Sequence, residues 1–216
     1  MKAGIKNAIL DALFPKDAVC VSCGREAVTD QNGFCSDCAA GLELFNAKEP
    51  PDHVDGYASV YLYNDVSSRM IKRLKYNNAR YLAKPLADAI AIPPDWDFDA
   101  VIPIPLYFRR EMKRGYNQSE LIAKKLCERI SKALDTGLLI RIRDTGQQTR
   151  LTEAGRKLNV KGAFAADAKV KGMRLLLIDD VRTTGATLSE CAAELKRFGA
   201  ETVYAVTVCC AEVQNR

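Results

Sequence analysis

Four consecutive aliphatic residues, Leu175 to Ile178, run directly into two carboxylic acids, Asp179 and Asp180. An apolar run without alternation is typical of a strand that is buried on both faces of a parallel sheet. Small and hydroxylic residues follow at positions 183–187, and apolar residues then recur at helical spacing from Leu188 to Phe198. The segment therefore predicts a strand over 174–179, a tight loop and a helix over 187–198, which is a unit of an α/β fold.

The loop between this strand and this helix has the composition of a phosphate-binding site. The start of a helix has unpaired backbone N–H groups and a partial positive charge, so small residues there can surround an anion. The residues expected to bind the ligand are Thr183, Thr184, Gly185, Ala186 and Thr187. Because two adjacent carboxylates would repel a phosphate, Asp179 and Asp180 are interpreted as acceptors for ribose hydroxyl groups or as ligands of a hydrated Mg²⁺. Together these features describe a site for a 5-phosphoribosyl group.

This order of strand, acid pair and Thr-Thr-Gly loop resembles the motif that binds 5-phosphoribosyl 1-pyrophosphate (PRPP) in type I phosphoribosyltransferases. The resemblance implies an α/β fold with a phosphoribosyltransferase-like parallel sheet flanked by helices. Arg182 is a departure, because such motifs more often have an aliphatic residue there. The alternative is an ordinary buried strand that is followed by a turn and a capped helix.

The length and charge of the chain limit its organisation. A chain of 216 residues can form one α/β core and a small additional module. The break at residues 49–52, Glu-Pro-Pro-Asp, predicts a boundary between a module at 1–50 and a domain at 51–216. No apolar window is long enough to span a bilayer, and residues 4–14 read as an amphipathic helix, so we expect no membrane span and a cytoplasmic location. The formal charge of +5 fits a phosphorylated substrate, a weak attraction to nucleic acid or a solvated basic surface.

Four cysteines near the N-terminus form two Cys-x-x-Cys pairs, Cys20 with Cys23 and Cys35 with Cys38. Two residues between cysteines allow both thiolates of a pair to reach one ion, and two pairs complete a tetrahedral sulfur shell that suits Zn²⁺. With all four sulfurs used, the site is expected to be structural, and so small a segment would depend on the metal to fold. A redox Cys-x-x-Cys pair and a disulfide framework are the alternatives.

Two further segments are candidates for binding anions. Residues 99–105 predict a short buried strand that ends at its prolines, and ligands bind at the carboxyl ends of such strands. Cations then precede a helix start, where we expect them to meet pyrophosphate: Arg109, Arg110, Lys113 and Arg114. The polar segment 143–158, which carries Arg143 and Arg150, has the composition of a lid that closes over an anionic substrate. A solvated loop is the alternative for each segment.

Taken together, these motifs resemble the ComF family of phosphoribosyltransferase-like proteins, which is linked to DNA uptake in natural competence. The resemblance is carried by the paired Cys-x-x-Cys and by the segments Ile71–Tyr76, Ile102–Leu106, Arg114–Gln118 and Thr149–Leu151, with Arg156, Asn159 and the acid-pair loop. It implies a zinc ribbon, a hood-like region at 51–95 and a phosphoribosyltransferase core at 96–216. It also implies that Pro103, Ile104 and Pro105 lie in the pyrophosphate loop and that residues 143–152 form the flexible catalytic loop.

The function implied is a Mg²⁺-dependent transfer of a phosphoribosyl group from PRPP to an unknown acceptor. The hypothesised catalytic residues are Asp179, Asp180, Arg143 and Arg150. Two other classes remain open. The chain could be a sensor that binds PRPP or a nucleotide without turnover. It could also be an adaptor that binds single-stranded DNA or a competence helicase through its zinc ribbon and the basic helix expected at 66–76.

Overall fold

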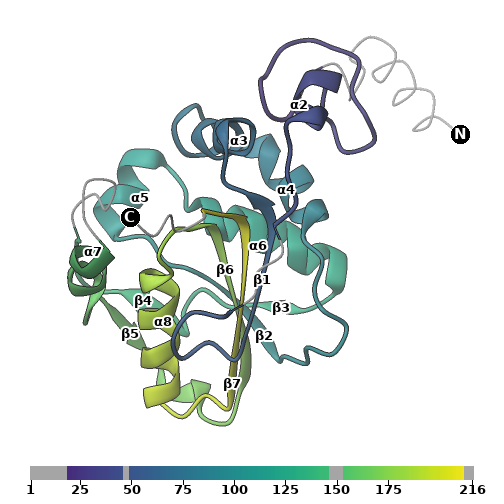
Figure 1. Cartoon of the computed structure of the whole chain (residues 1–216). Helices are drawn as coiled ribbons and strands as arrows, with labels where there is room; N and C mark the ends of the chain where they lie inside the picture. Colours follow the sequence, from purple (N-terminus) through teal and green to yellow (C-terminus); the bar gives the residue numbers. More distant parts are fainter. Residues whose placement is uncertain (1–18, 46–48, 146–152, 212–216) are drawn as a thin grey trace, which may run out of the picture.

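The aliphatic run and the acid pair form the central strand of a parallel sheet. The computed structural model describes residues 19–45, 49–145 and 153–211, so the helix expected at 4–14 lies outside the described residues. Five strands make up the sheet, in the order β1-β7-β6-β2-β3, and all neighbouring pairs are parallel (Figure 1). Their bounds are Gly56–Leu62 (β1), Ala100–Pro103 (β2), Ala133–Leu134 (β3), Arg174–Arg182 (β6) and Thr202–Cys210 (β7). This is a type I phosphoribosyltransferase-like α/β fold, as the sequence predicts.

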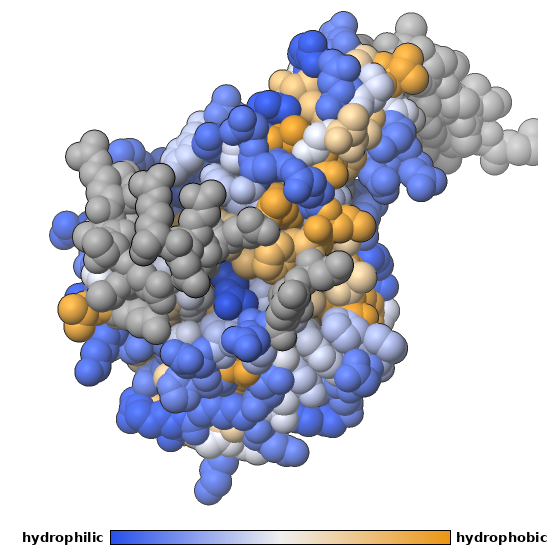
Figure 2. All heavy atoms as spheres, in the orientation of Figure 1, coloured by the Kyte–Doolittle hydropathy of each residue, from blue (hydrophilic) through white to orange (hydrophobic). Residues whose placement is uncertain are grey.

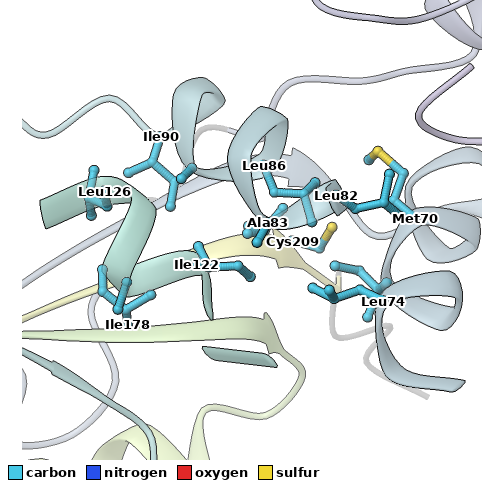
Figure 3. Packing of buried hydrophobic residues seen from close by; sticks show 14 of the residues in the cluster. Met70, Leu74, Leu82, Ala83, Leu86, Ile90, Ile122, Leu126, Ile178 and Cys209 are labelled. Atoms are coloured by element: carbon cyan, nitrogen blue, oxygen red, sulfur yellow. The ribbon is translucent and has the colours of Figure 1, made fainter. Parts of the chain in front are cut away.

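The central strand β6 is buried on both faces because helices cover both sides of the sheet. Leu176 and Ile178 point to one face, where they share a core with α3 (Asp65–Tyr76), α4 (Ala83–Ala89) and α6 (Gln118–Ile130). Leu175 and Leu177 point to the other face and pack with α8 (Ala186–Arg197). Figure 3 shows the first core, in which Leu74, Leu86 and Ile122 converge from three helices. The two-residue period of the strand explains why an unbroken aliphatic run is needed here.

The remaining elements are short. A separate antiparallel pair is formed by β4 (Leu139–Arg141) and β5 (Phe164–Ala166), and α7 (Glu153–Val160) lies between them in the chain. The described part of the chain also contains the 3₁₀ turns η1 (Arg80–Leu82) and η3 (Ala168–Val170). The basic segment before α6 forms a short helix, α5 (Phe108–Arg114), in which no residue is buried. Within the described residues, no helix is long and apolar enough to cross a membrane.

The four-cysteine module, which we define as residues 19–45, contains one short helix, α2 (Ser36–Ala40). It projects from the sheet domain above α3 (Figure 1). Its buried residues Val21, Phe34 and Cys38 belong to the same hydrophobic core as Met70 and Ile71 of α3. On the face drawn in Figure 2, hydrophobic side chains gather between this upper module and the larger body. The module is therefore packed on the domain and not merely tethered to it.

Candidate functional site

The acid pair lies at the carboxyl end of β6, beside the end of β2. Pro103 pairs with Ile178 across the two strands, and the backbone N–H of Ile104 donates to the carbonyl oxygen of Ile178 at 2.8 Å. A cleft of about 350 Å³ opens at this edge of the sheet. Its lining residues are Tyr63, Lys75, Ile104, Pro105, Leu106, Gln118, Arg141, Asp179, Asp180, Val181, Thr183 and Thr187. The sheet thus brings the predicted ribose-binding acids and the predicted pyrophosphate loop to one cleft.

The two acids have different partners. Asp180 is only 3% exposed; it accepts a hydrogen bond from Gln118 Nε2 at 3.2 Å and forms an ion pair with Lys75. Asp179 accepts a hydrogen bond from the Ser119 hydroxyl at 2.8 Å. Gln118 and Ser119 are the first residues of α6, whose N-cap Asn117 also donates to the carbonyl oxygen of Ile104 at 3.0 Å. The start of α6 therefore fixes both acids and the end of β2 at once.

These surroundings separate the pKa values of the two carboxyl groups. Burial, together with the neighbouring Asp180 charge, raises the pKa of Asp179 to about 7. Burial also opposes ionisation of Asp180, but the charge and hydrogen bond of Lys75 outweigh it and hold the pKa of that carboxyl below its usual value. Near neutral pH the pair therefore carries one firmly held negative charge and one that a proton can neutralise.

A pH-dependent effect on stability follows from Asp179. The folded protein keeps its proton up to a pKa of about 7, whereas the unfolded chain releases it near the ordinary value of 3.8. The stabilisation from this group is therefore complete below about pH 4 and is lost as the pH rises through about 7. Replacing Asp179 with Asn is expected to raise the free energy of unfolding, relative to wild type, more at about pH 8 than at about pH 5. Urea unfolding at both pH values measures this; an equal difference at the two would contradict it.

The predicted phosphate loop follows directly after the acids. Thr183, Thr184, Gly185, Ala186 and Thr187 surround a small hollow with Asp179 at its edge. Gly185 is the N-cap of α8 and has φ +83°, a conformation that side chains disfavour, and a Cβ there would lie 3.1 Å from Pro51 Cβ. The unusual Arg182 also lines this hollow; its guanidinium donates to the carbonyl oxygen of Glu49 at 2.9 Å and lies over the ring of Tyr57.

The predicted basic residues are not all near the cleft. Arg114 donates to the side chain of Gln118, which lines the cleft, and so lies at its edge. Arg109 and Lys113 are exposed on α5 and are not among the lining residues. The exposed Arg143 donates to the carbonyl oxygens of Asn159 and Lys161, beside α7. Arg150 lies outside the described residues.

Sequence reasoning missed two cations in the cleft. Lys75 is one of several basic residues on a helix, and Arg141 lies in a short strand, so neither is among the predicted site residues. Arg141 packs its guanidinium 5.2 Å from the ring centre of Phe164 and donates to the Thr145 hydroxyl, while its buried Nε has no hydrogen-bond partner among the described residues. A half-buried guanidinium whose buried Nε–H has no partner is suited to an anionic ligand. The only signal in the sequence was a charged residue within a short apolar strand.

The side chains of the four N-terminal cysteines converge and bring their sulfur atoms together. Their sulfur atoms all lie within 4.8 Å of one another, and the sulfurs of Cys23 and Cys35 are 3.9 Å apart. Tetrahedral Zn–S bonds of about 2.3 Å require sulfur separations of about 3.8 Å, so the set fits one Zn²⁺. Arg25 and Arg69 donate toward the sulfurs of Cys23 and Cys38 at 3.5 and 3.6 Å, as suits thiolates. All eight cysteines of the chain are free, which argues against a disulfide framework.

The other four cysteines are also buried but belong to the sheet domain: Cys127 on α6, Cys191 on α8, and Cys209 and Cys210 on β7.

The chain is similar in sequence to a known protein domain and to several known proteins. Residues 78–215 match the phosphoribosyl transferase domain. DNA utilization protein YhgH of Salmonella typhi is 31% identical over 209 residues, which cover 88% of this chain and 89% of that protein. Competence protein F of Haemophilus influenzae is 27% identical, over 87% of this chain and 88% of that protein. Among solved structures, a glutamine PRPP amidotransferase from B. subtilis is 23% identical over 59% of this chain and 25% of that chain, with a TM-score of 0.39.

The fold and the matched domain thus define a phosphoribosyltransferase-type domain protein. More narrowly, the chain belongs to the ComF/YhgH family of phosphoribosyl transferase domain proteins, with a four-cysteine cluster ahead of the domain.

Proposed function

We propose that this protein binds PRPP with Mg²⁺ in the cleft at the end of β6 and transfers its phosphoribosyl group to an acceptor. The observation that carries the proposal is the convergence of three parts on one cleft: the acid pair, the Thr-rich loop and the end of β2. Calorimetric titration of the zinc-loaded protein with PRPP and Mg²⁺ tests it. A saturable heat of binding supports the proposal, and its absence in folded protein would refute it.

Each part has a role that its chemistry suits. The backbone N–H groups and hydroxyls of residues 183–187 would bind the 5-phosphate at the start of α8. Asp179 and Asp180 would accept hydrogen bonds from the ribose hydroxyl groups. Pro103, Ile104 and Pro105 would form one wall of the pyrophosphate site, with Arg114 at its edge and Arg141 as a further, half-buried cation. The four cysteines would hold a structural Zn²⁺.

The reaction would be a displacement at the anomeric carbon of the ribose, through a transition state with positive charge on the sugar. The carboxylates of β6, which line the cleft, would stabilise that charge, and cations of the cleft would stabilise the departing pyrophosphate. Bound Mg²⁺ would neutralise charge on the pyrophosphate oxygens. Arg143 and Arg150 stay the proposed catalytic cations, of which Arg150 lies outside the described residues. A PRPP sensor would bind in the same way but release no pyrophosphate in the presence of any acceptor, which a turnover assay distinguishes.

Similar proteins are named for DNA utilization and competence, so we place the activity in DNA uptake or use. A basic and aromatic surface favours a second function, binding of single-stranded DNA. Tyr76 and Tyr81 are 73% and 59% exposed, which is unusual for large aromatic rings. The cations beside them are Arg73, which contacts Tyr81, Arg114, which lies over Tyr76, and Arg80, which donates to the Gly115 carbonyl. Exposed rings for base stacking and cations for phosphates are what single strands require.

Replacing both Tyr76 and Tyr81 with Ala is expected to weaken binding of a single-stranded oligonucleotide at least tenfold, because stacking contributes about 1–3 kcal/mol per base. Wild-type affinity should also fall steeply with salt, since phosphate contacts release counterions. Fluorescence anisotropy over a salt series measures both. Phe108→Ala, at an exposed aromatic outside this surface, is the control. Equal binding by wild type and the double variant, or affinity that does not respond to salt, would contradict this function. A helicase partner would then be the remaining form of the adaptor hypothesis.

A further inference from the structure

Helix α3 touches the four-cysteine module along one side. Arg73 Nη1 donates to the carbonyl oxygens of Cys20 and Val21 at 3.0 and 2.8 Å. Ser22 Oγ donates to the carbonyl oxygen of Val66 at 2.9 Å, and Arg69 donates toward the sulfur of Cys38. The contacts therefore involve the loop between the first two cysteines and the metal-ligating sulfur itself. If this loop lost its structure, residues in two successive turns of α3 would lose hydrogen-bond partners.

The last turn of the same helix reaches the acid pair. Lys75 projects from it into the cleft, where it forms the ion pair with the buried carboxylate of Asp180. The hydroxyl of Tyr116 donates to the carbonyl oxygen of Leu74, so this turn is also tied to the segment that leads into α6. Asp180 is thus held from two directions, by Lys75 of α3 and by Gln118 of α6.

Capping and burial make α3 a rigid helix. Asn64 caps its start with hydrogen bonds to the N–H groups of Val66 and Ser67, and Ser67 completes a capping box. Met70, Ile71 and Leu74 are fully buried against the sheet domain or the module. A capped helix of three turns does not bend easily, so a displacement at Arg73 is transmitted to Lys75 half a turn later.

We propose that α3 links the metal-binding module to the catalytic cleft, and that Lys75 is a positioning residue that orients Asp180 for the ribose of PRPP. The inference rests on the proposed function for its ligand. It assigns the four-cysteine module a second role besides folding. A module that holds its metal keeps α3 in place, and α3 keeps Lys75 against the carboxylate of Asp180, which stays aimed into the cleft.

The link is tested first without any ligand. Hydrogen exchange at the backbone amides of residues 74–76 is compared in full-length, metal-loaded wild type, Arg73→Met and Lys72→Met. Lys72 is an exposed residue of the same helix and serves as the matched control. Exchange should be faster in Arg73→Met and unchanged in Lys72→Met. Ser22→Ala removes only the hydroxyl contacts of the loop and replaces Arg73→Met if that variant does not retain its metal. Unchanged exchange in both Arg73→Met and Ser22→Ala would overturn the proposal.

The second test is the affinity for PRPP. Arg73→Met and Lys75→Met should each weaken binding about five- to tenfold, a typical size for coupling between sites. Because both act through Asp180, the double variant should bind no more weakly than Lys75→Met alone. Fully additive losses would show that Arg73 acts by another route and would overturn the link. If wild type binds no PRPP, the proposed function fails, and the exchange comparison still decides whether α3 links the two sites.

A pH profile separates positioning from a merely structural role. Without Lys75 the carboxyl group of Asp180 loses its cation, so the affinity of Lys75→Met for PRPP should recover toward wild type as the pH is raised. The other ionisable groups around the pair remain in place: Asp179 on β6, Arg114 on α5, Arg141 on β4, Cys209 on β7, and Tyr63 after β1. A loss that is the same at every pH would mean that Lys75 only supports the fold, which contradicts its positioning role.

Discussion

Replacing both acids, Asp179→Asn with Asp180→Asn, is expected to abolish detectable binding of PRPP while the protein stays folded. Asn has almost the shape of Asp but carries no charge, so the ribose hydroxyl groups would lose two charged acceptors. Hydrogen bonds to charged groups contribute about 1.5–3 kcal/mol each, so the affinity should fall roughly a hundredfold or more. Calorimetric titration with PRPP and Mg²⁺ at about pH 8, above the pKa of about 7 of Asp179 so that both carboxyl groups are ionised in the wild type, measures the loss.

The structure offers a matched control for this double variant. Asp97 and Asp99 lie at the opposite end of the sheet, where both pair with Arg174 at the start of β6. Replacing these two with Asn makes the same change in charge far from the cleft and should leave the affinity for PRPP unaltered. Circular dichroism checks the fold, since Lys75 loses its partner in the first variant. Wild-type affinity in the Asp179/Asp180 variant would rule out the ribose role of the pair.

Removing the metal is expected to unfold the four-cysteine module. This segment buries little apolar surface of its own, and structural Zn²⁺ sites in small peptides contribute about 10–16 kcal/mol of apparent binding free energy. Wild-type protein should contain one zinc per chain, and Cys35→Ala should contain none and melt at a lower temperature. Metal analysis and thermal unfolding measure the two effects.

Cys127→Ala is the control for this experiment, because Cys127 is also a buried thiol but lies on α6, away from the module. It should retain one zinc per chain and lose only the stability that a small core truncation costs. Stoichiometric zinc in Cys35→Ala, or its absence from carefully purified wild type, would contradict a four-cysteine site.

Much of the site could be predicted because its signals are local. The strand predicted over 174–179 lies within β6, Arg174–Arg182, and the helix predicted over 187–198 matches α8, Ala186–Arg197, to within one residue at each end. Such features depend on hydrophobic periodicity and residue order over a short stretch of the chain, which the sequence shows directly. The metal site could be predicted for the same reason, because each Cys-x-x-Cys pair brings two sulfurs within reach of one ion through its local spacing.

Two features gave no such signal. Residues 108–114, interpreted as a basic stretch ahead of a helix, form α5, in which no residue is buried, so no apolar periodicity marks it. Lys75 follows the buried stripe of α3 and is one of several basic residues on that helix. Its partner Asp180 is distant in the chain, and a pattern within one helix cannot show which cation another element will meet.

The sequence by itself determined which chemical groups this protein can use: a strand with two acids, a loop suited to phosphate, and four sulfurs suited to one metal. Only the tertiary structure decided which groups meet. Pairing of β6 with β2 brings the proline-rich end of β2 beside the two acids. Packing of α3 between the four-cysteine module and the sheet brings Lys75 into an ion pair with Asp180. The physical reason is that local propensities act over neighbouring residues, whereas strand register and helix packing are set by burial of the whole core.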